Sequence, residues 1–182
     1  MKVTGRYIDR YRKVHAERKY GGGDCGRVFD WAAKVCKQTG AESFLDYGCG
    51  QSDLRNFIKK NKSTGVSISR GFDPAIPGID ELPRCRFDVV MCSDVVEHVP
   101  EDELDCLLAN LKSLSRYPHR VMIVACCRPA LNTFEDGENM HCTVKPVSWW
   151  IDKVREHFPD TRLAARWPRK RYLITTFDHR GL

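Results

Sequence analysis

The sequence predicts an α/β fold built on a mostly parallel sheet. Short apolar runs typical of buried strands alternate along the chain with amphipathic helical patterns. The first strand ends in an acid and a turn with two glycines, Asp46-Tyr47-Gly48-Cys49-Gly50, before a helix begins. The last two strand patterns are joined by Pro168-Arg169-Lys170 alone. Because a parallel crossover needs a longer connection, this final pair is predicted to be antiparallel.

The N-terminal part of the chain carries two helical patterns. Residues 4–19 are polar and amphipathic, with two tyrosines and a valine at helical spacing, and the segment 20–23, with its glycine run, breaks the pattern. Residues 26–38 show a second apolar stripe. We expect residues 1–40 to form a helical cap on an α/β core of residues 41–182, both within a single domain.

The core pattern consists of strands that alternate with helices. Short apolar runs predict strands at residues 43–47, 66–72, 87–92, 120–126, 161–167 and 171–177. Apolar residues at three- and four-residue spacing predict helices at residues 53–60, 101–115 and 147–158. This alternation predicts a sheet covered by helices.

Composition indicates a globular protein of the cytoplasm. The chain has 182 residues, 42% of them hydrophobic and 30% charged. No apolar run approaches the roughly 20 residues of a membrane helix, and the charged N-terminus is unlike a secretory signal. The nine cysteines include no C-x-x-C pair, and the histidine spacing indicates no zinc site. We therefore expect reduced thiols, no metal and no membrane partner.

The net charge of +6 is concentrated at the two ends of the chain. Residues 1–27 and 153–182 each hold eight Lys and Arg against three Asp and Glu. The middle holds fourteen against eighteen. Basic ends suggest an anionic partner or substrate, and solvated helix faces explain the same pattern equally well.

Polar groups follow three of the predicted strands. The first group is the glycine turn after the first strand. The second is Asp73, which ends the second strand twenty-three residues after Gly50, near the spacing at which an acid binds ribose hydroxyls. The buried strand 87–92 ends in Cys92-Ser93-Asp94. Because ligands bind at the carboxyl ends of the strands in open α/β sheets, these groups predict a nucleoside pocket.

The turn also indicates which nucleoside cofactor fits. Dinucleotide-binding turns have a third glycine, and Ser52 and Asp53 stand in that stretch here. A carboxylate at Asp53 would lie at the positive end of the helix and repel a phosphate. A cofactor without phosphate fits better, and S-adenosylmethionine is such a cofactor.

Three segments resemble the class I S-adenosylmethionine-dependent methyltransferases. FLDYGCG is similar to the glycine-rich first motif of that family, and GFDPAI to its acidic second-strand motif. FDVVMCSDVVEHVPEDELDCLLANLKSL is similar to its fourth-strand block with a Glu-His pair. The likeness spans about residues 43–127. It implies a three-layer Rossmann-like methyltransferase fold, methyltransferase activity and S-adenosylmethionine as the cofactor.

The resemblance also implies roles for individual residues. Asp46 would contact the methionyl amino group, Gly48 and Gly50 would let the backbone approach the cofactor, and Asp73 would bind the ribose hydroxyls. The set of residues expected to line the cofactor is Asp46, Tyr47, Gly48, Cys49, Gly50, Asp73, Pro74, Ser93, Asp94 and Val95. His98 belongs to the Glu-His pair, and we interpret it as structural.

The chain departs from the family between its second and third strands. The family has a further strand there, ending in an acid that contacts adenine. Phe87 follows Asp73 by only fourteen positions, and three of the residues between them are prolines. We expect the third-strand region to be shortened, which leaves Asp80 or Glu81 as the candidate for the adenine contact.

The long loop after residue 126 carries the candidates for the acceptor site. His141 is the candidate catalytic base, because an imidazole can accept a proton near neutral pH. Arg128 is a candidate substrate-binding residue. Trp149 is placed to stack on a flat substrate if it is not part of the core.

Three functions remain open on the sequence alone. The leading hypothesis is a methyltransferase acting on a small or anionic acceptor. A second is a methyltransferase that modifies RNA or DNA, to which the basic and aromatic cluster at residues 166–172 would bind. Against it, residues 93–96 lack the Asn/Asp-Pro-Pro-aromatic motif of amino-methylating enzymes. A third is a non-catalytic module of the same fold that only binds S-adenosylmethionine.

Overall fold

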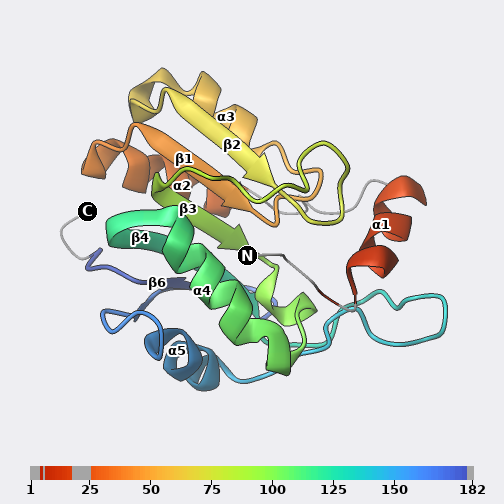
Figure 1. The fold of residues 1–182 in the computed structure, drawn as a ribbon. Helices are drawn as coiled ribbons and strands as arrows, with labels where there is room; N and C mark the ends of the chain where they lie inside the picture. Colours follow the sequence, from red (N-terminus) through yellow and green to blue (C-terminus); the bar gives the residue numbers. More distant parts are fainter. Residues whose placement is uncertain (1–4, 6, 18–25, 180–182) are drawn as a thin grey trace.

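A six-stranded sheet covered by helices forms the body of the protein (Figure 1). The computed structural model describes residue 5 and residues 7–17 and 26–179. The strands are β1 (Ser43–Tyr47), β2 (Ile68–Phe72), β3 (Phe87–Ser93), β4 (Ser115–Cys126), β5 (Arg162–Trp167) and β6 (Arg171–Thr175). The α-helices are α1 (Ile8–Glu17), α2 (Gly26–Thr39), α3 (Leu54–Lys60), α4 (Leu104–Leu114) and α5 (Val147–Arg155).

The order of the strands across the sheet is β2-β1-β3-β4-β6-β5. β1 pairs in parallel with β2 and β3, and β3 pairs in parallel with β4. β6 lies between β4 and β5 and is antiparallel to both. The predicted mostly parallel sheet with an antiparallel C-terminal strand is therefore confirmed.

Side chains that alternate along the central strands divide the core into two layers. Phe44 and Met91 point to the face covered by α2 and α3, whereas their neighbours Leu45 and Val90 point to the face covered by α4 and α5. This alternation follows from the two-residue repeat of a strand. Because both faces are covered, the central strands are apolar along most of their length, as buried parallel strands are.

The predicted elements agree with the observed ones except near their ends. The first strand has the predicted bounds, Ser43–Tyr47. The helix predicted at residues 101–115 begins instead with a 3-10 turn, Glu101–Glu103, before α4. β4 starts at Ser115, earlier than predicted, because the buried Ser115 pairs with Phe87 of β3 before a shift in register that resumes the pairing at Arg120. Local sequence could not show this pairing, since residues 116–118 are exposed and lack an apolar pattern.

The shortened third-strand region is also confirmed. Between Phe72 and Phe87 the chain forms turns and no strand, so β2 is the edge of the sheet. Asp73 N–H donates to the carbonyl of Ile79 at 3.0 Å, which closes this connection into a compact loop. Asp80 and Glu81 belong to the loop and do not line the cavity described below.

The N-terminal helix starts later than predicted. Gly5 and Tyr7 lie before α1, which begins at Ile8, and its described part, Ile8–Glu17, has no buried residue. The predicted break at residues 20–23 lies outside the described residues. In Figure 1, α1 stands apart from the sheet, beside the long loop that follows β4.

Cysteine serves as a core residue in this fold. The eight described cysteines are all free thiols, and four of them, Cys36, Cys49, Cys92 and Cys126, are buried. This agrees with the expected use of cysteine as a small apolar side chain. Among the described helices, none has the length and apolar character required to span a bilayer.

The packing of α4 on the sheet can be tested by removing one buried side chain. Leu111 is 0% exposed, so Leu111→Ala should lower the free energy of unfolding by about 2–5 kcal/mol. Leu131 is 81% exposed, and Leu131→Ala should change the free energy by less than about 0.5 kcal/mol. Urea unfolding followed by circular dichroism measures both, and equal effects would contradict this packing.

Candidate functional site

A cavity of about 530 Å³ opens at the carboxyl ends of β1, β2 and β3. Residues of α1, the loop after β4 and the turn between β5 and β6 complete its wall. Of the residues predicted to bind cofactor or substrate, the cavity is lined by Asp46, Tyr47, Gly48, Cys49, Asp73, Pro74, Ser93, Asp94, Val95, Arg128 and His141. The parallel pairing of the strands brings these side chains to one edge of the sheet.

The turn after β1 needs glycine at its first bend. Gly48 has φ +70°, and a Cβ placed there would lie 2.5 Å from the nearest methyl of Val95. The N–H groups of Gly48 and Cys49 both donate to the carbonyl of Phe72, at 2.7 and 3.1 Å. The turn is thus hydrogen-bonded to the end of β2 on one side and packed against Val95 on the other.

Asp46 is buried at the base of this turn. Its Oδ2 has no hydrogen-bond partner among the described residues. Burial raises the pKa of Asp46 to about 7. The positive charge of Arg55 acts in the opposite direction, and the negative charge of Asp73 raises the pKa slightly further. A buried carboxylate without a partner is costly, so it marks a place where a cationic ligand would be bound favourably.

Asp73 holds the two neighbouring loops together. Its Oδ2 accepts the N–H of Gly50 at 2.8 Å, and its Oδ1 accepts the N–H of Ala75 at 2.9 Å. Gly50 itself does not line the cavity, but this bond fixes its backbone beside it. The remaining acceptor positions of the carboxylate lie at the cavity wall, where hydroxyl groups of a ligand would find them.

Asp94 pairs with an arginine that the sequence analysis did not assign to the site. Arg171 of β6 donates from Nε to Oδ1 at 2.7 Å and from Nη2 to Oδ2 at 2.5 Å, and Ser93 Oγ also donates to Oδ2. Such two-pronged pairs combine strength with fixed geometry. The only sequence signal for Arg171 was the basic and aromatic cluster at residues 166–172.

Glu97, His98 and His141 meet beside Asp94. Glu97 is 0% exposed, and burial together with Asp94 raises its pKa well above the usual range. His98 Nδ1 lies 2.8 Å from the carbonyl of Met140, and burial and the nearby His141 lower the pKa of His98 to about 4. His141 Nδ1 lies 2.6 Å from the carbonyl of Arg128, and burial lowers its pKa as well. Both imidazoles are therefore neutral at neutral pH.

Helix α1 contributes a wall that the sequence analysis did not foresee. Tyr7, Tyr11 and His15 line the cavity, and the Tyr11 hydroxyl donates to the carbonyl of Met140 at 2.8 Å. Arg10 pairs with Asp136 and Glu138, which binds α1 to the loop after β4. The tyrosine spacing was visible in the sequence, but it was interpreted only as helical periodicity.

Comparisons with known proteins identify the fold. No model of a known family matches the chain, and no curated protein sequence does either. Among solved structures, the 1,6-didemethyltoxoflavin-N1-methyltransferase of Burkholderia thailandensis, with bound 1,6-didemethyltoxoflavin and S-adenosylhomocysteine, has a TM-score of 0.64 at 16% identity. That match covers 93% of this chain and 87% of the other.

Two further structures agree. The N-terminal domain of EvdMO1, in the presence of S-adenosylhomocysteine and D-fucose, has a TM-score of 0.53 at 16% identity, over 93% of this chain and 94% of that one. A methyltransferase of Bacteroides fragilis in complex with S-adenosylhomocysteine has a TM-score of 0.51 at 13% identity, over 77% and 75%. The chain has the class I S-adenosylmethionine-dependent methyltransferase fold.

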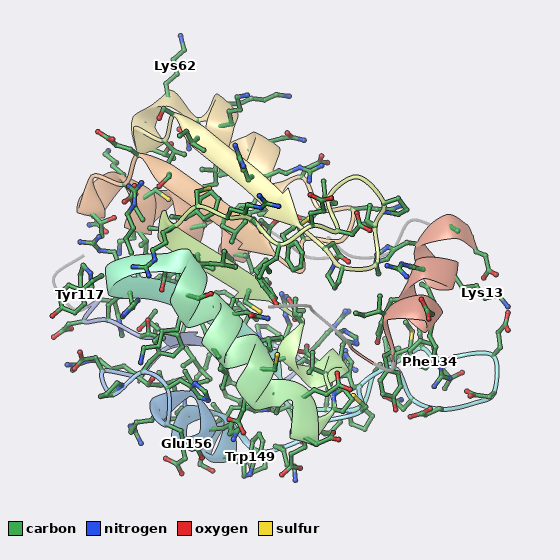
Figure 2. All side chains as sticks on the ribbon, viewed as in Figure 1. Lys13, Lys62, Tyr117, Phe134, Trp149 and Glu156 are labelled. Atoms are coloured by element: carbon green, nitrogen blue, oxygen red, sulfur yellow. The ribbon has the colours of Figure 1, made fainter. Side chains whose placement is uncertain are left out.

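The two residues predicted to bind the substrate differ in their position relative to the cavity of this methyltransferase fold. Arg128 lines the cavity, although its Nε donates to the carbonyl of Arg169 and its Nη1 to that of Pro129. Trp149 does not line the cavity. Its ring packs against the core from α5, with the Lys145 ammonium 5.1 Å from the ring centre, and Figure 2 shows it far from α1. The predicted stacking of Trp149 on a substrate is therefore not supported by its position.

The close approach at Gly48 can be tested with two glycines that share a positive φ. Gly48→Ala adds a clash with Val95 to the backbone strain, whereas Gly78→Ala, at φ +88° with nothing within 4 Å of its Cβ, adds the strain alone. Gly48→Ala should therefore destabilise the protein by about 1–3 kcal/mol more than Gly78→Ala, measured by urea unfolding. The double variant Gly48→Ala/Val95→Ala should recover part of the difference. No recovery would contradict the contact.

Proposed function

We propose that the protein is an S-adenosylmethionine-dependent methyltransferase that acts on a small-molecule acceptor. The observation that carries the proposal is the buried Asp46 carboxylate at the glycine turn of a methyltransferase fold, whose Oδ2 has no hydrogen-bond partner among the described residues. S-adenosylmethionine carries the ammonium group that such a carboxylate would bind. Structures of the same fold that hold S-adenosylhomocysteine, the product of methyl transfer, support the choice of cofactor.

The residues around the cavity fit the rest of that cofactor. Asp73 would accept the ribose hydroxyls, and the bare backbone of Gly48 would allow the methionine part to pass closely. Ser93, Asp94 and Val95 would line the methionine side. Asp53, at the start of α3, is exposed and makes no capping hydrogen bond, which keeps a negative charge where a phosphate would otherwise bind. The bound cofactor supplies an electrophilic methyl group on a sulfonium.

The cavity limits the size of the acceptor. Its volume of about 530 Å³ is within the range of small-molecule sites, so the cofactor leaves room only for a modest second ligand. Arg128 and Arg169 at the wall favour an acceptor with negative charge. The toxoflavin precursor named for the Burkholderia enzyme is a small molecule, which supports this size class without identifying the acceptor of this chain.

His141 is the residue we assign to the acceptor. Its Nδ1 lies against the carbonyl of Arg128, which leaves Nε2 to interact with a hydroxyl or amino group in the cavity. The reaction is a direct displacement, so the protein must align the acceptor with the methyl group and assist the loss of its proton. His141→Ala should therefore lower kcat by about 10²–10⁴-fold. Its affinity for S-adenosylhomocysteine should remain within about twofold of the wild type, since the predicted cofactor contacts are elsewhere. A normal kcat in this variant would remove His141 from the reaction.

Cofactor binding should depend on pH through Asp46. Its pKa of about 7 means that the carboxyl group is protonated below pH 7 and charged above it. Only the charged form attracts an ammonium group, so the affinity for S-adenosylhomocysteine should fall about tenfold from pH 8 to pH 6. Isothermal titration calorimetry measures this change.

A pair of variants tests whether Asp46 causes the pH dependence of S-adenosylhomocysteine binding. Asp46→Asn should bind weakly and with little dependence on pH, because an amide does not titrate. Asp53→Asn, a change at an exposed acid close by, should keep the behaviour of the wild type. If Asp46→Asn bound with the same affinity and pH dependence as the wild type, Asp46 would not be the cofactor contact.

A labelling experiment separates the small-molecule acceptor from the two alternatives. The protein is incubated with methyl-labelled S-adenosylmethionine and with separate pools of metabolites, RNA and DNA. Label in the metabolite pool supports the proposal. Label in RNA or DNA, weakened by salt, would favour a nucleic-acid substrate bound by the basic ends. Cofactor binding without transfer to any pool would favour a non-catalytic module.

A further inference from the structure

A buried Glu and two His meet at the wall of the cavity. One ligand atom from each of Glu97, His98 and His141 lies within 4.8 Å of the other two. Glu97 and His98 belong to the 3-10 helix Val96–His98 after β3, and His141 comes from the loop after β4. Thr143 joins the two segments: its N–H donates to the carbonyl of Glu97 at 3.0 Å, and its hydroxyl to that of Val99 at 2.7 Å.

The buried carboxylate of Glu97 is the feature that indicates a bound ligand. The side chain is 0% exposed, and neither carboxylate oxygen has a hydrogen-bond partner within the described part of the chain. The two-pronged pair with Asp94 already engages the Arg171 guanidinium. An isolated buried carboxyl group is expensive to keep, and a bound cation would remove that cost.

The two imidazoles are oriented as metal ligands usually are. Each has its Nδ1 close to a main-chain carbonyl, that of Met140 for His98 and that of Arg128 for His141. The Tyr11 hydroxyl, which donates to the same Met140 carbonyl, also lies 2.7 Å from His98 Nδ1. A hydrogen bond from Nδ1 to a carbonyl fixes the tautomer in which Nε2 carries a lone pair, and it holds the ring in place. The ring centres are 4.6 Å apart and the rings meet edge to face at 81°, while one ring nitrogen of each lies within 4.8 Å of the other.

We propose that Glu97, His98 and His141 bind one divalent transition-metal ion at the wall of the cavity. Two imidazoles and one carboxylate form a ligand set suited to Zn²⁺, Fe²⁺ or Co²⁺, with positions left open for a further ligand. Ligand atoms about 2.0–2.1 Å from a tetrahedral ion lie roughly 3.4 Å apart. The separations of up to 4.8 Å therefore require the ligand atoms to approach one another by up to about 1.4 Å when the ion binds.

The ion would define the acceptor class, an inference that rests on the proposed function. A hydroxyl oxygen of the acceptor would occupy an open position and release its proton to water, because coordination lowers its pKa. The oxygen lone pair would then form the bond to the methyl carbon as the carbon–sulfur bond breaks. The electron pair of the carbon–sulfur bond would stay on sulfur, and S-adenosylhomocysteine would leave. His141 would act through the ion rather than as a free base, and the acceptor would carry a hydroxyl group.

A metal site at these residues departs from the expectation of no metal. That expectation rested on the spacing of cysteines and histidines along the chain. His141 follows His98 by 43 residues, so no local motif contains all three proposed ligands.

The site is tested by adding metal to tag-free protein that has been stripped with a chelator and dialysed. Co²⁺ should bind one ion per chain and give visible d–d absorption, and Zn²⁺ should displace it. Glu97→Gln and His141→Ala should each weaken Co²⁺ binding at least tenfold. His157→Ala should not, since His157 lies at the end of α5 and contacts Asp105. Because Cys142 is close to Glu97, a thiolate-to-cobalt band would overturn the proposed ligand set.

Binding of S-adenosylhomocysteine by every variant provides the independent readout. A wild-type protein that binds it but takes up no Co²⁺ would overturn the metal site and leave the proposed function standing. Equal loss of Co²⁺ in His141→Ala and His157→Ala would also overturn the site. A protein that binds Co²⁺ through these residues but not S-adenosylhomocysteine would keep the metal site and contradict the proposed function.

Discussion

The parallel pairing of β1 between β2 and β3 determines where the glycine turn and the acidic groups at the strand ends lie. Tyr47 is in register with Phe72 on one side and with Cys92 on the other, so the three strands end together. The residues that follow, from the glycine turn to Asp73 and Asp94, therefore meet at one edge. A slip by one residue would turn the buried side chains of β1 to the opposite face and separate these groups.

This convergence concentrates negative charge in a buried place. Asp46, Asp73, Asp94 and Glu97 all line the same cavity, and Arg171 pairs with Asp94. The consequence is visible in the raised pKa values of Asp46 and Glu97. Such an edge costs folding free energy when it is empty of cations, which is a common property of sites that bind a ligand. The two proposed cations, an ammonium group at Asp46 and a metal ion at Glu97, would lie where the unpaired carboxyl groups are.

The outer wall of the cavity is held together by surface ion pairs. Arg10 and Lys13 of α1 reach Asp136, Glu138 and Glu135 of the loop after β4 (Figure 2). Pairs of this kind contribute little individually, and α1 buries none of its residues. The hydrogen bond from the Tyr11 hydroxyl to Met140 and the packing of Tyr11 against Phe134 also bind α1 to this loop.

Much of the fold followed from local patterns. The bounds of β1, the missing strand after β2 and the antiparallel β6 were predicted from apolar runs and connection lengths, because these depend on neighbouring residues. The glycine turn, Asp73 and Ser93-Asp94 were also found, since strand ends can be recognised where an apolar run stops. Trp149, predicted to stack on a substrate, does not line the cavity, and a helix pattern does not tell which end of the sheet a side chain will face.

What only the tertiary structure decided are contacts between segments far apart in the chain. The pair between Asp94 and Arg171 spans 77 residues, and the Tyr11 hydroxyl meets Met140 across 129. The meeting of Glu97 and His98 with His141 is of the same kind. The amino-acid sequence by itself determined the elements, the strand ends and the methyltransferase resemblance, since each depends on residues close together. Which loops close over those ends depends on strand order and on packing across the whole sheet, and no spacing along the chain records it.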